Sequence, residues 1–161
     1  IKTVADLRGK KIVFGGGPHA MLSYIMPSLL LSQAGLRQGE YQAEFARHPG
    51  NAALAVCVKQ ADAAGTSDIA LDMPVVSNRC DTSTLSQLLK GKPLAQLPWA
   101  VKGSLRAELH ERIQQVLISA KQYADGRAAL ASAELTGLLP AVDHDYDEYR
   151  AIVREALDER Y

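Results

Sequence analysis

One stretch of the sequence decides the fold: Ile12-Val13-Phe14-Gly15-Gly16-Gly17-Pro18-His19-Ala20-Met21-Leu22-Ser23-Tyr24. A β-branched and aromatic run meets three glycines, and a helical pattern begins directly after them. Glycine lets the backbone turn sharply, and Pro18 suits the first turn of a helix. That first turn has unpaired N–H donors at the positive end of the helix dipole. The stretch predicts a strand, a tight turn and a helix, and the turn either seats an anionic or polar ligand or only connects the two elements.

Composition narrows the class of protein. The chain has 161 residues, 47% of them apolar, with eighteen basic and eighteen acidic side chains. This length favours one domain with a real core. The sequence shows no basic face, so neither nucleic acid nor an anionic membrane is indicated as a partner. The longest apolar stretch, residues 25–31, is too short to span a bilayer. Because the chain begins at Ile1 without a signal-like segment, we expect an excised or processed piece.

The pattern along the chain alternates between strands and helices. Strands are predicted for residues 11–14, 41–45, 61–65, 85–89 and 99–101. Helices are predicted for residues 21–33, 52–59, 69–76 (interrupted by Pro74) and 104–120 (capped by Ser104), and from Asp145 on. This alternation predicts an α/β fold with a mostly parallel central sheet flanked by helices. Ligands of such sheets gather at the carboxyl ends of the strands, where residues 15–20 lie.

Few residues here suggest covalent chemistry. His110 lies in a charged helical pattern, and His144 lies among aspartates before the last helix, so both are interpreted as solvated. His19 and His48 are better candidates for a site, because each follows a predicted strand. No nucleophile stands in an elbow-type turn, and the glycine triplet has neither the dinucleotide-binding spacing nor a following Gly-Lys-Ser/Thr. The sequence therefore predicts that the chain is not an enzyme and has no cofactor.

The two cysteines leave two interpretations open. Cys57 lies in an apolar helical pattern, where a small buried thiol is the simpler reading. A disulfide to Cys80 is the alternative in an oxidising compartment. There is no Cys-x-x-Cys motif, so a zinc or thioredoxin-like site is not expected.

Several short motifs in a fixed order carry a family resemblance. They are Asp6–Lys10, Pro27 within the first helix, Ala34-Gly35 at its end, Ala61–Ala63, Pro98-Trp99 and Asp145–Arg150. In this order, from about Val4 to about Tyr149, the chain resembles the phosphate/phosphite/phosphonate ABC-transporter substrate-binding proteins. That family has the type 2 periplasmic binding fold, in which two α/β lobes close on a ligand.

The resemblance implies an organisation and a role. Residues 1–101 would form the second α/β lobe, and residues 102–161 would form C-terminal helices that pack on a missing N-terminal lobe. We then expect an exposed apolar patch on the C-terminal helices and self-association through it. The implied role is the periplasmic or extracytoplasmic solute-binding component of an ABC importer, which hands a small polar or anionic ligand to a permease. The alternative is the ligand-sensing domain of a membrane signalling protein of the histidine kinase type.

The resemblance also implies a site, and the sequence departs from the family there. A Ser-Thr-Ser run that gives hydroxyl and backbone donors to phosphoryl oxygens falls on Ala20, Met21 and Leu22, so only the backbone donors remain. His19, Met21, Tyr24 and His48 replace the hydroxyls, a set that would also suit copper, although no metal site is predicted. Alternatively, Met21 and Leu22 are core residues. The candidate ligand-binding residues are Gly17, His19, Ala20, Met21, Leu22, Ser23, Tyr24, His48, Thr66, Ser67 and Asp68.

Overall fold

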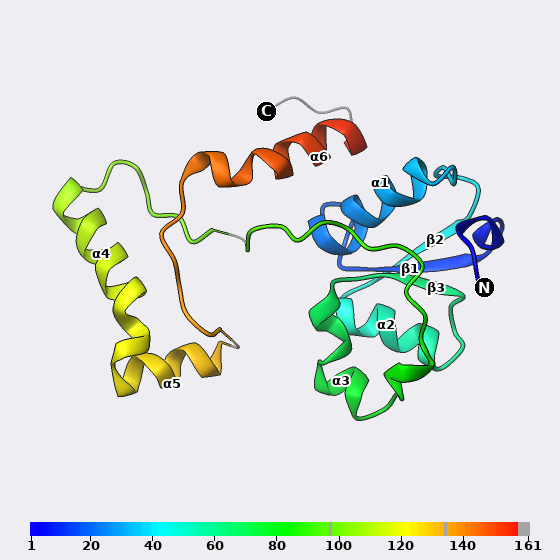
Figure 1. The fold of residues 1–161 in the computed structure, drawn as a ribbon, viewed down its shortest axis with the longest axis horizontal. Coiled ribbons are helices and arrows are strands. Elements are labelled where there is room, and N and C mark those ends of the chain that lie inside the picture. The colour runs from blue at the N-terminus through cyan, green and yellow to red at the C-terminus, as the bar shows by residue number, and fades with distance from the viewer. Residues whose placement is uncertain (97, 134, 158–161) are drawn as a thin grey trace. The chain divides into compact units, whose positions relative to one another are not determined.

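The computed structural model describes residues 1–96, 98–133 and 135–157. The chain divides into two compact units, one formed by residues 1–94 with the segment from Glu148 on, the other by residues 95–147. Figure 1 labels the helices and strands of both. Among the described residues, no helix has both the length and the apolar character needed to cross a bilayer.

A three-stranded parallel sheet forms the centre of the first unit. Its strands are β1 (Lys11–Gly15), β2 (Gln42–Ala46) and β3 (Ala63–Gly65), in the order β2-β1-β3. Phe14 is paired with Phe45 on one side and with Gly65 on the other. The α/β fold with a parallel sheet is therefore confirmed, as are the three strands predicted within residues 11–65. Parallel neighbours need crossover connections, which the helices supply.

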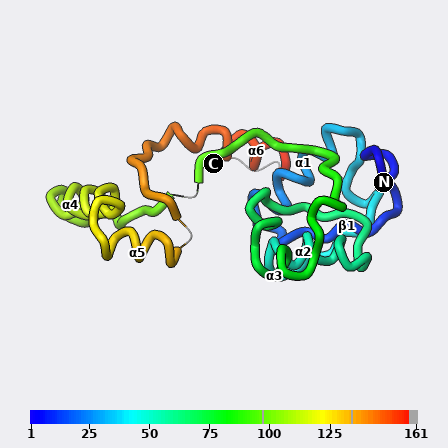
Figure 2. Tube along the Cα trace, turned by 60° about the horizontal axis from the view of Figure 1, so that its bottom comes forward, coloured from blue at the N-terminus to red at the C-terminus, as the bar shows by residue number. Residues whose placement is uncertain are grey.

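Helices cover both faces of this sheet. A π-helical turn, η2 (Met21–Ile25), runs directly into α1 (Met26–Gln33), and α2 (Pro49–Cys57) follows β2. Figures 1 and 2 show α1 and α2 on opposite sides of the sheet. The helix predicted over residues 21–33 is confirmed, and α2 begins three residues before its predicted start because Pro49 occupies its first turn.

Short helical segments complete the first unit. They are η1 (Val4–Leu7), η3 (Asp68–Leu71), α3 (Pro74–Ser77) and η4 (Thr82–Thr84), and α6 (Asp147–Leu157) ends the described chain. The helix predicted over residues 69–76 is thus two helices, since Pro74 cannot continue η3 and instead starts α3. On α6, Ile152 is buried in one cluster with Ile25, Met26 and Leu29, so this helix packs on the α1 side of the sheet.

Besides the cluster around Ile152, the core of the first unit has two further hydrophobic clusters. Phe14 and Ile12 of β1 pack with Leu31, Leu36 and Tyr41. Under α2, Ala53 and Leu54 pack on Val76 of α3. Beside this small cluster Cys57 and Cys80 form a disulfide, with 5.8 Å between their Cα atoms. The interpretation of Cys57 as a free buried thiol was wrong, because the chain brings Cys80 back to the end of α2.

Two predicted strands are absent. Residues 85–89 and 99–101 pair with no strand among the described residues. Leu88 and Leu89 instead lie as an irregular segment against the core around Phe14, so their apolar character reflects packing and not pairing. Trp99 and Val101 are exposed, 65% and 44%.

The second unit consists of helices and connecting segments. It contains α4 (Ala107–Ser119), η5 (Ala120–Gln122), α5 (Ala124–Ser132) and η6 (Asp143–Tyr146). Ser104 is not the cap of α4, because residues 102–105 form a turn closed by the Leu105 N–H on the Lys102 carbonyl, and the helix begins after it. Asp145 lies in η6, where its carboxylate accepts the Val142 N–H at 2.9 Å, and α6 follows.

Candidate functional site

The carboxyl ends of all three strands meet at one edge of the sheet. Gly15 is paired with Ala46, and Phe14, one residue earlier, with Gly65. Because the strands are parallel, the segments that follow them leave from the same edge. The eleven predicted ligand-binding residues belong to these three segments: Gly17 and residues 19–24 after β1, His48 after β2, and residues 66–68 after β3. The topology therefore brings the three predicted segments to one edge.

The turn after β1 is fixed by its backbone. Gly16 has a positive φ of 86°, and its N–H donates to the Ala46 carbonyl at 2.7 Å, which ties the turn to β2. The Ala20 N–H then donates to the Gly17 carbonyl at 2.9 Å, which closes a turn over Pro18 and His19. Pro18 was predicted in the first turn of the helix, but it lies in this β-turn, where its fixed φ also suits it. The helix begins at Met21.

The helix start presents unpaired main-chain donors. In the described part of the chain, the N–H groups of Met21, Leu22 and Ser23 have no hydrogen-bond acceptor. First-turn N–H groups have no partner within their own helix, and the dipole of the helix adds positive potential at this end. Such a group of donors suits the oxygen atoms of an anion.

Two predicted side chains at this helix start pack inside the protein. The Ser23 side chain is buried, 4% exposed, and its hydroxyl donates to the Gly15 carbonyl. The Tyr24 ring lies 5.0 Å from both the Phe14 and Phe45 rings, edge to face with Phe14. At this edge Ser23 and Tyr24 therefore have structural partners, and Ser23 keeps its backbone N–H as a free donor.

Met21 and Leu22 differ from each other. Met21 packs against the cluster of Ile25, Met26 and Leu29, as its interpretation as a core residue anticipated. Leu22 is 38% exposed, so its interpretation as a core residue was wrong. Successive residues of a helical turn point in different directions, so these two neighbours differ in burial.

The start of α2 lies close to the turn after β1. His48 is exposed and extended, with φ −138°, and it directly precedes Pro49. A Cβ atom on Gly15 would lie 2.4 Å from the Pro49 Cα, so only glycine fits at this strand end. Sequence reasoning treated Gly15 as a flexible turn residue and missed this close approach. The sequence signal for this close approach was a glycine at the end of a buried strand, because glycine at such a position often marks close backbone contact.

The segment after β3 is tied to α2. The Thr66 hydroxyl, half-buried, donates to the Pro49 carbonyl at 3.1 Å. Ser67 is half-buried and extended at the start of η3. Asp68 is exposed, and its carboxylate accepts the Ile69 N–H at 2.9 Å, within its own helix. This edge of the sheet therefore combines main-chain donors after β1 with one carboxylate after β3.

The two histidines predicted for the site, His19 and His48, are both exposed. No group of three or more His, Cys, Asp and Glu side chains in residues 1–96, 98–133 and 135–157 is arranged to hold a metal ion.

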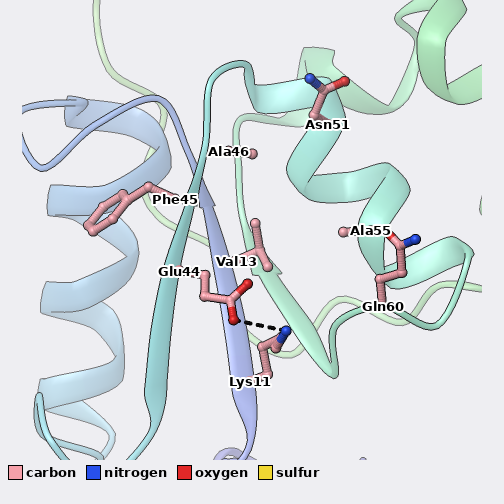
Figure 3. A pocket seen from close by; sticks show the side chains of 8 residues that line it. All are labelled: Lys11, Val13, Glu44, Phe45, Ala46, Asn51, Ala55 and Gln60. Carbon is pink, nitrogen blue, oxygen red and sulfur yellow. Dashed lines mark ion pairs between the residues drawn. The ribbon is translucent and has the colours of Figure 1, made fainter.

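A groove of about 440 Å³ runs beside α2 on one face of the sheet (Figure 3). Its lining residues are Lys11, Val13, Glu44, Phe45, Ala46, Asn51, Ala55 and Gln60. The Lys11 ammonium pairs with the Glu44 carboxylate at 2.8 Å within this lining. None of the eleven predicted residues lines the groove, although Ala46 at the end of β2 and Asn51 in the first turn of α2 do.

This architecture defines a class of protein. A parallel sheet with helix starts at its carboxyl edge is an α/β ligand-binding fold, and free N–H groups at that edge suit an anion. Residues 1–146 match the sequence model of a family described as ABC transporter, phosphonate, periplasmic substrate-binding protein. The chain belongs to this family.

Family membership confirms the resemblance inferred from the short motifs. The structure is consistent with one lobe of a periplasmic binding protein. Proteins of this family are periplasmic, non-enzymatic components of ABC transporters that bind a phosphonate-class solute. The family thereby supports a transport role, a small anionic ligand and an ABC permease as partner.

Proposed function

We propose that this chain binds a small polar or anionic ligand, of the phosphonate or phosphate class, at the carboxyl edge of its sheet. The observation that carries the proposal is the set of free N–H groups on Met21, Leu22 and Ser23, beside the loops at His48 and Thr66. The edge acts as one half of a cleft, and a second α/β lobe closes over the ligand. Closure then presents the ligand to an ABC permease, since a ligand shifts an open–closed equilibrium by its differential affinity.

The proposed recognition depends on the main chain more than on side chains. Ala20, Met21 and Leu22 carry no hydroxyl, and the hydroxyls of Ser23 and Thr66 already donate to protein carbonyls. A hydrogen bond to a charged oxygen contributes about 1.5–3 kcal/mol, so each missing hydroxyl lowers affinity for a phosphonate dianion. The carboxylate of Asp68 favours a ligand that also carries an amine.

An extracytoplasmic setting is part of the proposal. Disulfides persist in oxidising compartments such as the periplasm and are rare in the cytosol. The Cys57–Cys80 disulfide therefore supports the location that the family implies.

Thermal denaturation with a ligand panel tests the proposal. The panel is methylphosphonate, an aminoalkylphosphonate, inorganic phosphate, phosphite, methanesulfonate and Cu²⁺. A phosphonate at 100 times its Kd stabilises the protein by about 2.7 kcal/mol, which raises the melting temperature measurably. We expect the aminoalkylphosphonate to bind more tightly than methylphosphonate. The proposal would be contradicted if Cu²⁺ alone stabilised the protein. It would also be contradicted if no oxyanion of the panel stabilised it at millimolar concentration.

A serine substitution locates the site. Ala20→Ser restores one hydroxyl at the helix start and should tighten methylphosphonate binding about tenfold or more, as a charge-assisted hydrogen bond requires. Ala34→Ser is the matched control, because Ala34 is exposed at the other end of the same helix. Equal affinities for Ala20→Ser, Ala34→Ser and the unmodified chain, measured calorimetrically, would remove the helix start from the site.

A further inference from the structure

The disulfide closes a loop that contains one part of the candidate site. Cys57 is the last residue of α2, and Cys80 follows the end of α3 by three residues. The intervening chain includes β3, the Thr66–Asp68 segment, η3 and α3. The bond therefore ties both ends of this segment to α2, and α2 itself begins at the proposed ligand edge.

The enclosed segment also packs on α2 through a small apolar cluster. α3 is four residues long, and Val76 is its buried residue, packed on Ala53 and Leu54. Gly50 approaches closely, since a Cβ there would lie 2.7 Å from the Val75 side chain. The Thr66 hydroxyl adds one hydrogen bond to Pro49. A small cluster of this kind opens readily, because local stability follows the number of buried apolar contacts.

We propose that the Cys57–Cys80 disulfide is a redox-responsive brace that holds the Thr66–Asp68 segment in register with the start of α2. Both cysteines are half-buried, and the reductant that the proposal invokes is a small dithiol. The dithiol gives two electrons and two protons: the S–S bond breaks into two thiols, and the dithiol becomes a disulfide. The brace is then lost, η3 and α3 separate from α2 more often, and one side of the ligand edge moves. The effect on ligand affinity rests on the proposed function, whereas the effect on local opening does not.

Hydrogen exchange on the whole chain tests the brace without any ligand. Four samples are compared: the oxidised protein, the protein reduced with dithiothreitol, and the Cys57→Ser/Cys80→Ser variant with and without dithiothreitol. Closing a loop of this length restricts opening by about a hundredfold. We expect amide exchange in residues 66–77 to accelerate by about that factor on reduction, with little change in β1 and α1. The amides of the double variant should exchange as fast as those of the reduced protein, and their rates should not change when dithiothreitol is added.

Two results would overturn the brace. One is unchanged exchange in residues 66–77 after complete reduction. The other is an equal acceleration in β1, which would show that the bond stabilises the whole unit and not this segment in particular. Unfolding of the reduced protein or of the variant would have the same meaning. Calorimetry with methylphosphonate adds a separate readout, in which affinity should fall on reduction. If the oxidised protein binds no oxyanion, the proposed function fails, and the exchange data still decide the brace.

Discussion

The hydroxyl of Ser23 donates a hydrogen bond to the carbonyl oxygen of Gly15, across the turn that joins β1 to its helix. Gly15 is the last residue of the strand, and Ser23 lies in the first turn of the helix. Both residues are buried, so the bond is sheltered from water. It fixes where the helix starts relative to the strand end, and it thereby positions the free N–H groups at that start.

Ser23→Ala should destabilise the first unit. Without the hydroxyl, the buried Gly15 carbonyl lacks this partner, which costs about 1–3 kcal/mol. Urea unfolding monitored by circular dichroism measures the change. Ser77→Ala is the control: its hydroxyl also donates to a main-chain carbonyl, that of Met73, but it is exposed and should change stability by about 0.5 kcal/mol or less. Equal effects of the two substitutions would show that the Ser23 bond does not hold the turn.

Gly15→Ala should destabilise far more than Gly17→Ala, although the two glycines are two residues apart. A Cβ on Gly15 would lie 2.4 Å from the Pro49 Cα, whereas one on Gly17 meets no atom within 4 Å. Overpacking against the backbone costs about 1–3 kcal/mol or more, and a free position tolerates alanine. Unfolding in urea without ligand gives both values. A loss of less than 0.5 kcal/mol for Gly15→Ala would mean that α2 does not approach the strand end this closely.

The strand–turn–helix at residues 11–33 was predictable because periodicity and glycine chemistry are local signals. The meeting of three strand ends followed from the parallel order. The contact between Gly15 and Pro49 was not predictable, since it depends on how α2 packs. The strand predicted over residues 85–89 failed for the same reason: Leu88 and Leu89 are partly buried by the core without any pairing. Local sequence does not distinguish an apolar strand from an apolar segment lying across a core.

Acid should weaken the first unit partly through Glu40. The Arg37 N–H, at 2.7 Å, and the Arg8 guanidinium, at 3.2 Å, both donate to its carboxylate and lower the pKa of Glu40 below its usual value of 4.5. A carboxylate with a depressed folded-state pKa stabilises the protein above its unfolded-state pKa, and this stabilisation is lost as the pH falls through the folded-state value. The free energy of unfolding should therefore decrease as the pH is lowered below about 4.5.

Glu40→Gln tests this assignment. The variant should be less stable than the unmodified chain at pH 6 and should lose less stability between pH 5 and pH 3, because its amide does not titrate. Urea unfolding at several pH values gives both slopes. Asp72→Asn, an exposed position of the same unit, is the control and should keep the slope of the unmodified chain. Parallel pH profiles for Glu40→Gln and the unmodified chain would exclude Glu40 as a source of the acid sensitivity.

Substitutions on the exposed apolar face of α4 test the expectation that the chain self-associates. Val116 is 60% exposed and lines an apolar groove with Leu109, Ile113 and Leu117. If this face joins two chains, Val116→Glu places a charge in the interface, and the dimer Kd should rise by about tenfold or more, because burying an unpaired charge is costly. Gln114→Glu introduces the same side chain at a polar, exposed position of the helix and should leave the Kd within about twofold. Sedimentation velocity over a concentration series measures both values. A chain that stays monomeric at every concentration, or equal shifts for the two variants, would show that α4 does not mediate association.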